Sequence, residues 1–323
     1  MKAIALISGG LDSMLSARII EEEGIEVIKV NFKIPFCHLK PKSISTPDQN
    51  VRIIDISEKF IDLIKNPSHG FGSNMNPCLD CKILMLKEAK ELLGQWGASF
   101  VVTGEVLGQR PMSQHRRGLK LIAEESGLQG LLLRPLSAGL LDESIPEKEG
   151  WIRKNALLKF NGRSRRPQIE LAKHFGIKEY PNAAGGCLLT DKNFSNRLRD
   201  LIKYGQLTLR NIELLKFGRH FRLNNDAKLV VGRDEYENIQ IEKLAQDQDH
   251  LFLPTDDFAG PTSLGRGKFD SDLLRIAGEI TSYYCDRNLK SKADITYRKM
   301  PDEKPAILSF APILEETITT IRI

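Results

Sequence analysis

The stretch Ser8-Gly9-Gly10-Leu11-Asp12-Ser13 decides the fold of the N-terminal part of the chain, because it joins an apolar, β-rich run (2–8, KAIALIS) to a helical pattern over 13–23. Two glycines let a backbone turn tightly and approach a ligand closely. The N–H groups that open a helix point toward an anion, and the helix dipole adds to this attraction. No Gly-Lys-Ser/Thr follows, so this is not a Walker loop. The stretch predicts a phosphate-binding loop; an ordinary capped strand–turn–helix is the alternative.

Short apolar runs alternate with helical patterns on the C-terminal side of this loop. Such alternation is typical of an α/β fold, in which a parallel sheet carries helices on both faces. Ligands in these folds lie at the C-terminal ends of the strands. We expect further strands at 26–32, 51–57, 99–106 and 131–136, and a helix at 83–96.

A second, smaller α+β domain is expected to begin after Thr190, which divides the chain into residues 1–190 and 191–323. The segment before the boundary includes a predicted helix at 167–175. The segment after it opens with a basic helical stretch at 193–204, followed by strand-like runs and a helix at 270–286.

The composition of the 323 residues is that of a globular protein, with 41% hydrophobic and 28% charged residues. These fractions exclude a disordered or collagenous chain. No run of 18 apolar residues is present, and the N-terminus lacks a signal-peptide pattern, so we expect a cytoplasmic protein with no membrane partner.

The net charge of +5 is unevenly distributed. Residues 153–233 hold 18 Lys and Arg against 6 Asp and Glu, a net of +12, so the remainder of the chain sums to −7. A basic block inside an otherwise acidic chain indicates a polyanionic partner, of which nucleic acid is the usual one. A solvated basic face is the alternative.

Three of the five cysteines stand in distinctive contexts. Cys78 and Cys81 form a C-x-x-C pair just before a helical pattern, and Cys187 follows two glycines. A helix N-terminus stabilises a thiolate, the form that acts as nucleophile and metal ligand. The pair fits a redox couple, half of a zinc site or part of an iron–sulfur site; two buried small residues are the alternative. Cys37 and Cys285 are expected to be packing residues.

Two charged residues are expected near the phosphate loop, at the C-terminal ends of the parallel strands. A carboxylate at Asp12 would repel a phosphate unless a cation lay between them, and Mg²⁺ commonly bridges carboxylate and phosphate oxygens. Arg134, which ends the run LLLRPL, is a candidate phosphate clamp because its guanidinium matches phosphate geometry. A surface arginine is the alternative.

The segments SGGLDS, NPCLDCK, TGEVLGQRPMSQ, LLLRPL, GRSRRPQIELAKHFGI and AGGCLLTD occur in that order. Together they resemble the PP-loop (ATP pyrophosphatase) tRNA thiolation enzymes, the 4-thiouridine synthetase and 2-thiouridylase families, over residues 1 to about 200. The resemblance implies an adenine nucleotide alpha-hydrolase-like fold and a reaction in which ATP adenylates a uridine carbonyl oxygen of tRNA before sulfur replaces that oxygen. It implies that ATP is bound by Ser8, Gly9, Gly10, Asp12, Ser13, Gly104 and Arg134, with Mg²⁺ on Asp12.

The same resemblance implies that Asp12, Cys78, Cys81 and Cys187 are the catalytic residues. In some members a C-x-x-C pair and a distant cysteine hold an iron–sulfur cluster, and in others two cysteines carry out persulfide and disulfide chemistry. We expect a 4Fe–4S cluster on the three cysteines, with the persulfide relay as the alternative. The sulfur donor would be a cysteine desulfurase or inorganic sulfide.

The second domain is similar to the RNA-binding domain of NFACT proteins. The similarity lies in the run 230–238 (VVGRDEYEN), in Asp249 and in Gly260-Pro261. Together with the basic block it predicts that tRNA phosphates are contacted by Arg163, Arg165, Arg166, Arg197, Arg199, Lys216, Arg219 and Arg222.

Two other functions are compatible with parts of this pattern. PP-loop enzymes also adenylate carboxylates for amide synthesis, which requires no cysteine set. The NFACT-like part alone would suit a non-catalytic RNA-binding quality-control protein, but the phosphate loop favours an enzyme. An oligomer is possible.

Overall fold

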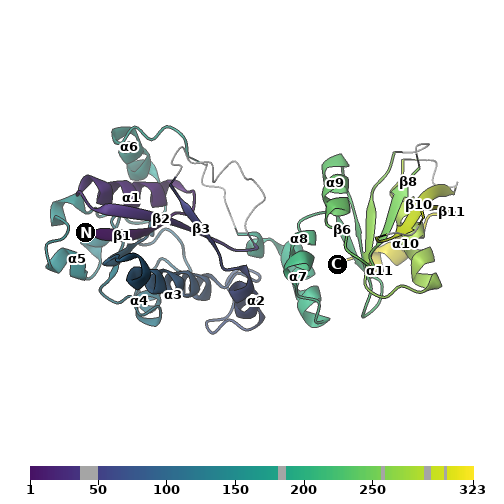
Figure 1. Cartoon of the computed structure of the whole chain (residues 1–323), viewed down its shortest axis with the longest axis horizontal. Coiled ribbons are helices and arrows are strands. Elements are labelled where there is room, and N and C mark those ends of the chain that lie inside the picture. The colour runs from purple at the N-terminus through teal and green to yellow at the C-terminus, as the bar shows by residue number, and fades with distance from the viewer. Residues whose placement is uncertain (37–49, 181–186, 256–258, 287–291, 302–303) are drawn as a thin grey trace. The chain divides into compact units, whose positions relative to one another are not determined.

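The structure, a computed structural model, describes residues 1–36, 50–180, 187–255, 259–286, 292–301 and 304–323. The chain divides into two compact units, Met1–Thr190 and Asp191–Ile323, and Figure 1 colours them from purple to teal and from green to yellow. No described helix combines the length and the apolar character that crossing a bilayer requires.

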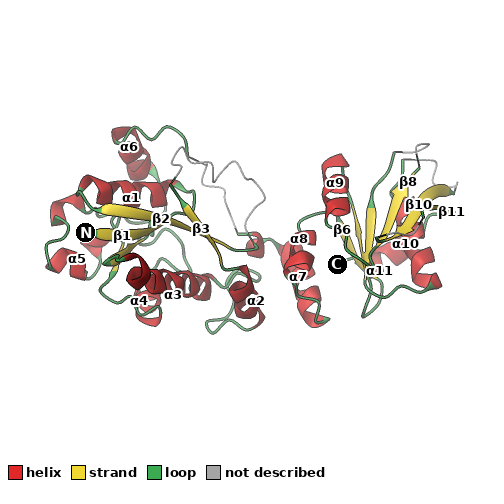
Figure 2. Cartoon of the chain, in the orientation of Figure 1, coloured by secondary structure: helices red, strands yellow, loops and turns green. Residues whose placement is uncertain are grey.

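The first unit is built on a parallel sheet, which confirms the predicted α/β class (Figure 2). Its strand order is β3-β2-β1-β4-β5, and every pairing is parallel. The strands are β1 (Lys2–Leu6), β2 (Glu26–Lys33), β3 (Arg52–Asp55), β4 (Phe100–Val102) and β5 (Leu132–Leu133).

Helices cover both faces of this sheet, with α1 and α6 on one side and α2, α3 and α4 on the other (Figure 1). The strand alternation explains the two layers: Ala3 and Ala5 belong to the buried cluster beneath α1, whereas Ile4, equally buried, faces the opposite layer. The helices are α1 (Leu11–Glu22), α2 (Ser57–Lys65), α3 (Cys78–Trp96), α4 (Arg116–Glu125), α5 (Ile145–Lys148) and α6 (Arg166–His174).

Strand β4 covers only three of the eight residues expected at 99–106, and two further elements differ from the sequence-based expectation. Helix α3 begins at Cys78 rather than at residue 83, because Pro77 precedes a polar first turn that carries no apolar periodicity. Strand β5 covers only two of the six expected residues. Pro135 has no N–H to donate to a ladder, so the run leaves the sheet beyond Leu133.

The second unit is built on a six-stranded antiparallel sheet of order β11-β10-β8-β9-β7-β6. Its strands are β6 (Arg219–Arg222), β7 (Lys228–Val231), β8 (His250–Pro254), β9 (Ser263–Arg266), β10 (Ala293–Lys299) and β11 (Ala306–Phe310). Its helices are α7 (Lys192–Lys203), α8 (Leu209–Leu214), α9 (Glu235–Lys243), α10 (Ser271–Tyr283) and α11 (Glu315–Ile321). The predicted α+β second part is thereby confirmed.

Two buried clusters lie on the two faces of this second sheet. On β7, Leu229 and Val231 pack with α10 and α11, while Val230 points to the cluster that includes α9. Cys285 is 6% exposed within the first cluster, which confirms it as a packing residue. The other expected packing cysteine, Cys37, lies outside the described residues.

Candidate active site

The phosphate loop is held in shape by its own hydroxyl groups. Gly9 has a positive φ of 78°, and Gly10 is the extended N-cap of α1. The Ser13 Oγ donates to the Gly10 carbonyl (2.7 Å) and accepts from the Ser8 N–H (3.2 Å). These bonds fold the loop around the first turn of α1, where the unpaired N–H groups of the helix favour an anion.

Gly104 lets the loop after β4 rest directly on the start of α1. A Cβ at this position would stand 2.5 Å from the Asp12 carbonyl carbon and 2.5 Å from the Ser13 nitrogen, which are backbone atoms that cannot move aside. Only glycine therefore fits here. Gly104, a predicted ATP-binding residue, thus allows two loops to approach each other closely at the C-terminal ends of the strands.

Asp12 lies between these strand ends and α6. Its Oδ2 accepts from the Gln109 Nε2 (2.8 Å), and the Gln109 Oε1 accepts from the Nε2 of the buried Gln168 (3.4 Å). Its Oδ1 is buried and has no hydrogen-bond partner among the residues that the structure describes. A carboxylate oxygen with no donor suits a cation such as Mg²⁺. Sequence reasoning missed both glutamines, although each stands in a quoted motif, TGEVLGQRPMSQ or GRSRRPQ.

Arg134 is buried in the strand-end edge. Its Nε donates to the Glu105 Oε2 (3.0 Å) and its Nη2 to the Leu119 carbonyl (3.0 Å). Burial alone would raise the pKa of the Glu105 carboxyl, but the charges of Arg134 and Lys82 and the hydrogen bonds to this carboxyl hold the pKa below its usual value. Arg134 is therefore a buried arginine that links Glu105 to the Leu119 carbonyl, not a surface arginine. Its contact with phosphate stays a prediction.

The segment of Cys187 is fixed to the turn that precedes the C-x-x-C pair. The Met75 N–H donates to the Leu189 carbonyl (3.1 Å), and the Asn74 side chain donates to the Thr190 carbonyl (2.7 Å). Cys78 is the first residue of α3, and its Sγ accepts from the Asn76 Nδ2 (3.0 Å). Cys78 and Cys187, which are far apart in the sequence, therefore belong to segments that lie side by side in the fold.

These cysteines, like the phosphate loop, lie at the C-terminal ends of the parallel strands. Helix α3 runs back to the start of β4, so its N-terminus lies at the C-terminal ends of the parallel strands. The Leu188 N–H donates to the carbonyl of Phe36 (3.1 Å), three residues beyond β2 at these strand ends. Within the described ranges, no three His, Cys, Asp or Glu side chains gather as metal ligands.

His69 ties the C-x-x-C turn to α4. Its Nδ1 lies 3.1 Å from the Asp80 Oδ1 and its Nε2 lies 3.0 Å from the Glu125 Oε1. The hydrogen bond to Asp80 raises the pKa of His69, with help from the charges of both carboxylates. The imidazole therefore holds the first turn of α3 in place. Nothing in the sequence spacing signals this contact.

Arg163, Arg165 and Arg166 stand at the start of α6, and Gln168 links this helix end to Asp12. Arg163 and Arg166 are exposed and Arg165 is half-buried. Among the described residues, none of the three guanidinium groups takes part in an ion pair or a hydrogen bond. They are therefore available to an external anion.

The predicted RNA-contacting residues of the second unit differ in availability. Arg199 is exposed. The Arg197 Nη1 donates to the Leu215 carbonyl (3.0 Å), and burial lowers the pKa of Arg197 to about 10. The other three are also engaged: Lys216 with Glu213 (2.8 Å), Arg219 with the Gly232 carbonyl (3.0 Å), and Arg222 with Asp200 through its Nε (3.1 Å).

Comparison with known families gives two matches. Residues 1–146 match the family described as "Thiamine biosynthesis protein (ThiI)", and residues 218–321 match the "NFACT protein RNA binding domain". The chain therefore carries a ThiI-family domain followed by an NFACT-type RNA-binding domain. Both resemblances recognised in the sequence are confirmed.

Curated relatives match the N-terminal part. A "Probable tRNA sulfurtransferase" of Thermococcus kodakarensis is 28% identical over 152 residues, which are 45% of this chain and 39% of that protein. A "tRNA-specific 2-thiouridylase MnmA" of Helicobacter hepaticus is 28% identical over 164 residues, 45% of each chain. The MnmA of Leptospira interrogans is 33% identical over 131 residues, 32% of this chain and 33% of that protein. The chain thus spans less than half of each of these relatives.

Among solved structures, the C-terminal part of the fibronectin/fibrinogen-binding protein from Streptococcus suis aligns with 55% of this chain and 83% of that chain. Its TM-score is 0.29 at 13% identity.

Proposed function

We propose that this protein is an ATP-dependent tRNA-uridine sulfurtransferase. The observation that carries the proposal is the meeting of two features at one sheet edge. The phosphate loop opens α1 there, and the hydrogen bonds from Met75 and Leu188 bring the Cys187 segment to the turn before Cys78 at the same edge. The tRNA-modifying relatives named above support the same reaction class.

The proposed chemistry has two steps. The carbonyl oxygen of a uridine attacks the α-phosphorus of ATP, the bond between the α-phosphorus and the bridging oxygen breaks, and pyrophosphate leaves. Sulfide then attacks the activated ring carbon, and AMP leaves with the original oxygen. Where a cysteine desulfurase supplies the sulfur as a cysteine persulfide, the terminal sulfur attacks the ring carbon, AMP leaves, and the thiolate of a second cysteine attacks the inner sulfur as the S–S bond breaks. The disulfide formed between the two cysteines is then reduced by an external thiol before the next turnover. The product is 4-thiouridine or 2-thiouridine, depending on which carbonyl enters the site.

The residues of the phosphate loop would position the triphosphate for this reaction. Ser8, Gly9, Gly10 and Ser13 would contact the pyrophosphate end of ATP, and Gly104 keeps the neighbouring loop close to them. Asp12 would hold Mg²⁺ through its buried, unpartnered Oδ1, while Gln109 fixes the other oxygen. When bound, Mg²⁺ would neutralise phosphate charge during pyrophosphate departure.

Cys78, Cys81 and Cys187 would carry the sulfur. A 4Fe–4S cluster on all three and a persulfide relay between two of them are the two forms of this proposal. Among the described side chains, no three His, Cys, Asp or Glu residues gather as metal ligands. An anaerobic absorbance spectrum with iron measured per chain separates the two forms, because only the cluster contributes iron and a visible band.

The RNA would be held by the NFACT-type domain and by the exposed arginines. Arg163, Arg165, Arg166 and Arg199 have the access that phosphate contacts require. Arg197, Lys216, Arg219 and Arg222 already have internal partners. We therefore propose that this second group acts mainly as support for the RNA-binding surface.

The test is an anaerobic thiolation assay with tRNA, ATP and sulfide, read by mass spectrometry of the nucleosides. The protein should form thiouridine, and Cys187→Ala should lose the product while still binding ATP. Cys285→Ala is the matched control, since Cys285 packs in the core of the other unit and should not affect the yield. Full activity in Cys187→Ala would contradict the proposal.

Release of pyrophosphate without thiouridine would identify a different acceptor. Full pyrophosphate release in a Cys78→Ala/Cys81→Ala variant, with a carboxylate as acceptor, would indicate an amide-forming ligase instead.

A further inference from the structure

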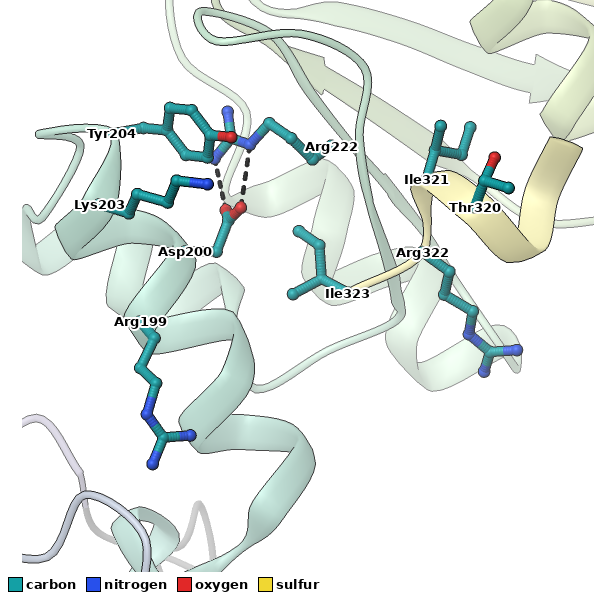
Figure 3. Close-up of a pocket in the computed structure, with 9 residues that line it drawn as sticks. All are labelled: Arg199, Asp200, Lys203, Tyr204, Arg222, Thr320, Ile321, Arg322 and Ile323. Atoms are coloured by element: carbon teal, nitrogen blue, oxygen red, sulfur yellow. Dashed lines mark hydrogen bonds and ion pairs between the residues drawn. The ribbon is translucent and has the colours of Figure 1, made fainter.

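The second unit contains a pocket of about 460 Å³ between α7, β6 and the C-terminal segment (Figure 3). Four cationic side chains line it, Arg199, Lys203, Arg222 and Arg322, together with one carboxylate, Asp200, the ring of Tyr204 and residues 320, 321 and 323. Its volume is in the range of small-ligand sites. The first part of its wall, on α7, precedes the segment that matches the NFACT domain.

Asp200, the one carboxylate side chain among the described lining residues, is already paired with cations of the protein. Asp200 forms a two-pronged ion pair with Arg222, seen as the dashed lines in Figure 3, and also lies 3.4 Å from the Lys228 Nζ. Its side chain is only 10% exposed. Asp200 therefore presents little negative charge to a ligand and instead fixes the Arg222 guanidinium, which also donates to Gln206 (3.0 Å).

Tyr204 orders the cations around it. The Arg222 Cζ lies 4.4 Å and the Lys203 Nζ 5.0 Å from the centroid of its ring. A cation over an aromatic face is attracted by the ring quadrupole. Arg222 is thus held from two sides, whereas Lys203, Arg199 and Arg322 are exposed at the rim. Arg222 and Tyr204 thus form a fixed inner side of the pocket, and three positive charges remain exposed at its rim.

Such a site favours an anion with several oxygen atoms and does not discriminate between nucleobases. Guanidinium and ammonium groups are the usual partners of phosphate oxygens. Among the described lining residues, the cationic side chains exceed the carboxylate side chains by three. A phosphate within a strand would satisfy this excess, and the open rim would let the chain enter and leave.

We propose that this pocket binds a phosphate of an RNA strand, with Lys203, Arg199 and Arg322 as the contacts and Arg222 and Tyr204 as the positioning wall. The proposal rests on the RNA-binding part of the function proposed above, and it adds Lys203 and Arg322 to the RNA-contacting residues. Free ATP or pyrophosphate shares the phosphate chemistry and must be distinguished by experiment.

The test uses the full chain, a fluorescently labelled single-stranded RNA 12-mer and a tRNA transcript, titrated at several salt concentrations. The variant Lys203→Gln/Arg322→Gln removes two rim charges of the pocket. The variant Lys243→Gln/Lys268→Gln removes two exposed charges of the same unit that do not line it. The pocket variant should weaken binding of both RNAs by about tenfold and reduce the slope of log K against log salt by about 1.5. The control should change affinity less than about threefold.

Equal loss in the two variants would overturn the proposal, because net charge alone would then explain the binding. Absence of RNA binding by the unaltered protein would also overturn it. Loss of ATP or pyrophosphate binding in the pocket variant, with RNA binding retained, would reassign the pocket to a free phosphate ligand. All four substituted side chains are exposed, so folding should be unaffected, and Arg199→Gln provides a second pocket variant with the same expected direction. Thiouridine formation is measured separately, so failure of the sulfurtransferase proposal leaves this result interpretable.

Discussion

The arginines at 163–166 and those at 197–222 form one basic block in the sequence, yet the two groups have different surroundings. In the first unit, Arg163 and Arg166 are exposed beside the helix whose Gln168 leads to Asp12. In the second unit, Arg197 and Arg222 point inward to a carbonyl and a carboxylate. The difference shows that a count of positive charges overestimates the surface available to RNA, because part of that charge stabilises the fold.

The same contrast extends to the polar atoms that lack partners. In the first unit, a carboxylate oxygen of Asp12 is buried and has no donor among the described residues, an arrangement that suits a cation. In the second unit, Asp200 is shared by Arg222 and Lys228. We propose that the Asp12 oxygen takes a ligand, whereas Asp200 is already paired within the protein.

The largest effect is expected from Asp200→Ala. The side chains of Asp200, Arg222 and Lys228 are 10%, 10% and 7% exposed, so removal of the carboxylate leaves two cations with little access to water. Breaking a buried pair in this way costs about 3–5 kcal/mol. The free energy of unfolding of the second unit, followed by circular dichroism in urea, should fall by that amount. Asp226→Ala, at an exposed position, should change it by about 0.5 kcal/mol or less. Similar values for the two would mean that the ion pairs contribute little.

A smaller loss of stability is expected from Gly104→Ala, because the added Cβ would meet the backbone of Asp12 and Ser13 at 2.5 Å. Overpacking of this kind costs about 1–3 kcal/mol. The separation of the two loops should also impair ATP-dependent pyrophosphate release. Gly94→Ala is the matched control: no atom lies within 4 Å of its Cβ position, and Gly94 lies within α3, so stability should be unchanged or rise by about 0.5–1 kcal/mol. Normal pyrophosphate release by Gly104→Ala would rule out the proposed role of this contact.

A pH dependence is expected from Lys228. Burial, partly offset by Asp200, lowers the pKa of Lys228 to about 7 in the folded state, whereas an unfolded lysine keeps its proton up to about pH 10.4. Between these values the unfolded state binds more protons, so stability should rise with pH, by at most about 1.4 kcal/mol per pH unit. Below pH 7 this contribution should be constant.

The variant Lys228→Met should therefore have a flatter stability curve from pH 7 to 9 than the unaltered protein. Lys243→Met, at an exposed position, should preserve the slope. Buried His220 affects stability at lower pH than Lys228 does. Burial holds its pKa well below the usual value, so its contribution to stability should fall as the pH drops below about 6.5. Equal slopes in the unaltered protein and Lys228→Met would contradict the assignment.

The sequence predicts the parts of the site that depend on local backbone geometry. Ser8–Ser13 follows a strand and opens a helix, and both the loop and the parallel sheet are present. Contacts between distant segments are not encoded in local spacing. The pairing of Arg134 with Glu105, the Gln168–Gln109–Asp12 chain and the docking of the Cys187 segment on Met75 depend on tertiary packing. Burial likewise decides which arginines are available, and composition does not report burial.

The smallest effect separates the two halves of the basic block directly. Arg165→Gln/Arg166→Gln removes two charges from the start of α6, and Lys216→Gln/Arg219→Gln removes two whose side chains are engaged within the second unit. Each phosphate contact contributes about 0.7–0.9 to the slope of log K against log salt for nucleic-acid binding. The first variant should lower the slope for tRNA by about 1.5 and leave ATP affinity unchanged. The second should lower it by less than about 0.5, measured on the folded fraction. Equal slopes would show that Lys216 and Arg219 exchange their internal partners for RNA, and the two halves of the block would then be equivalent.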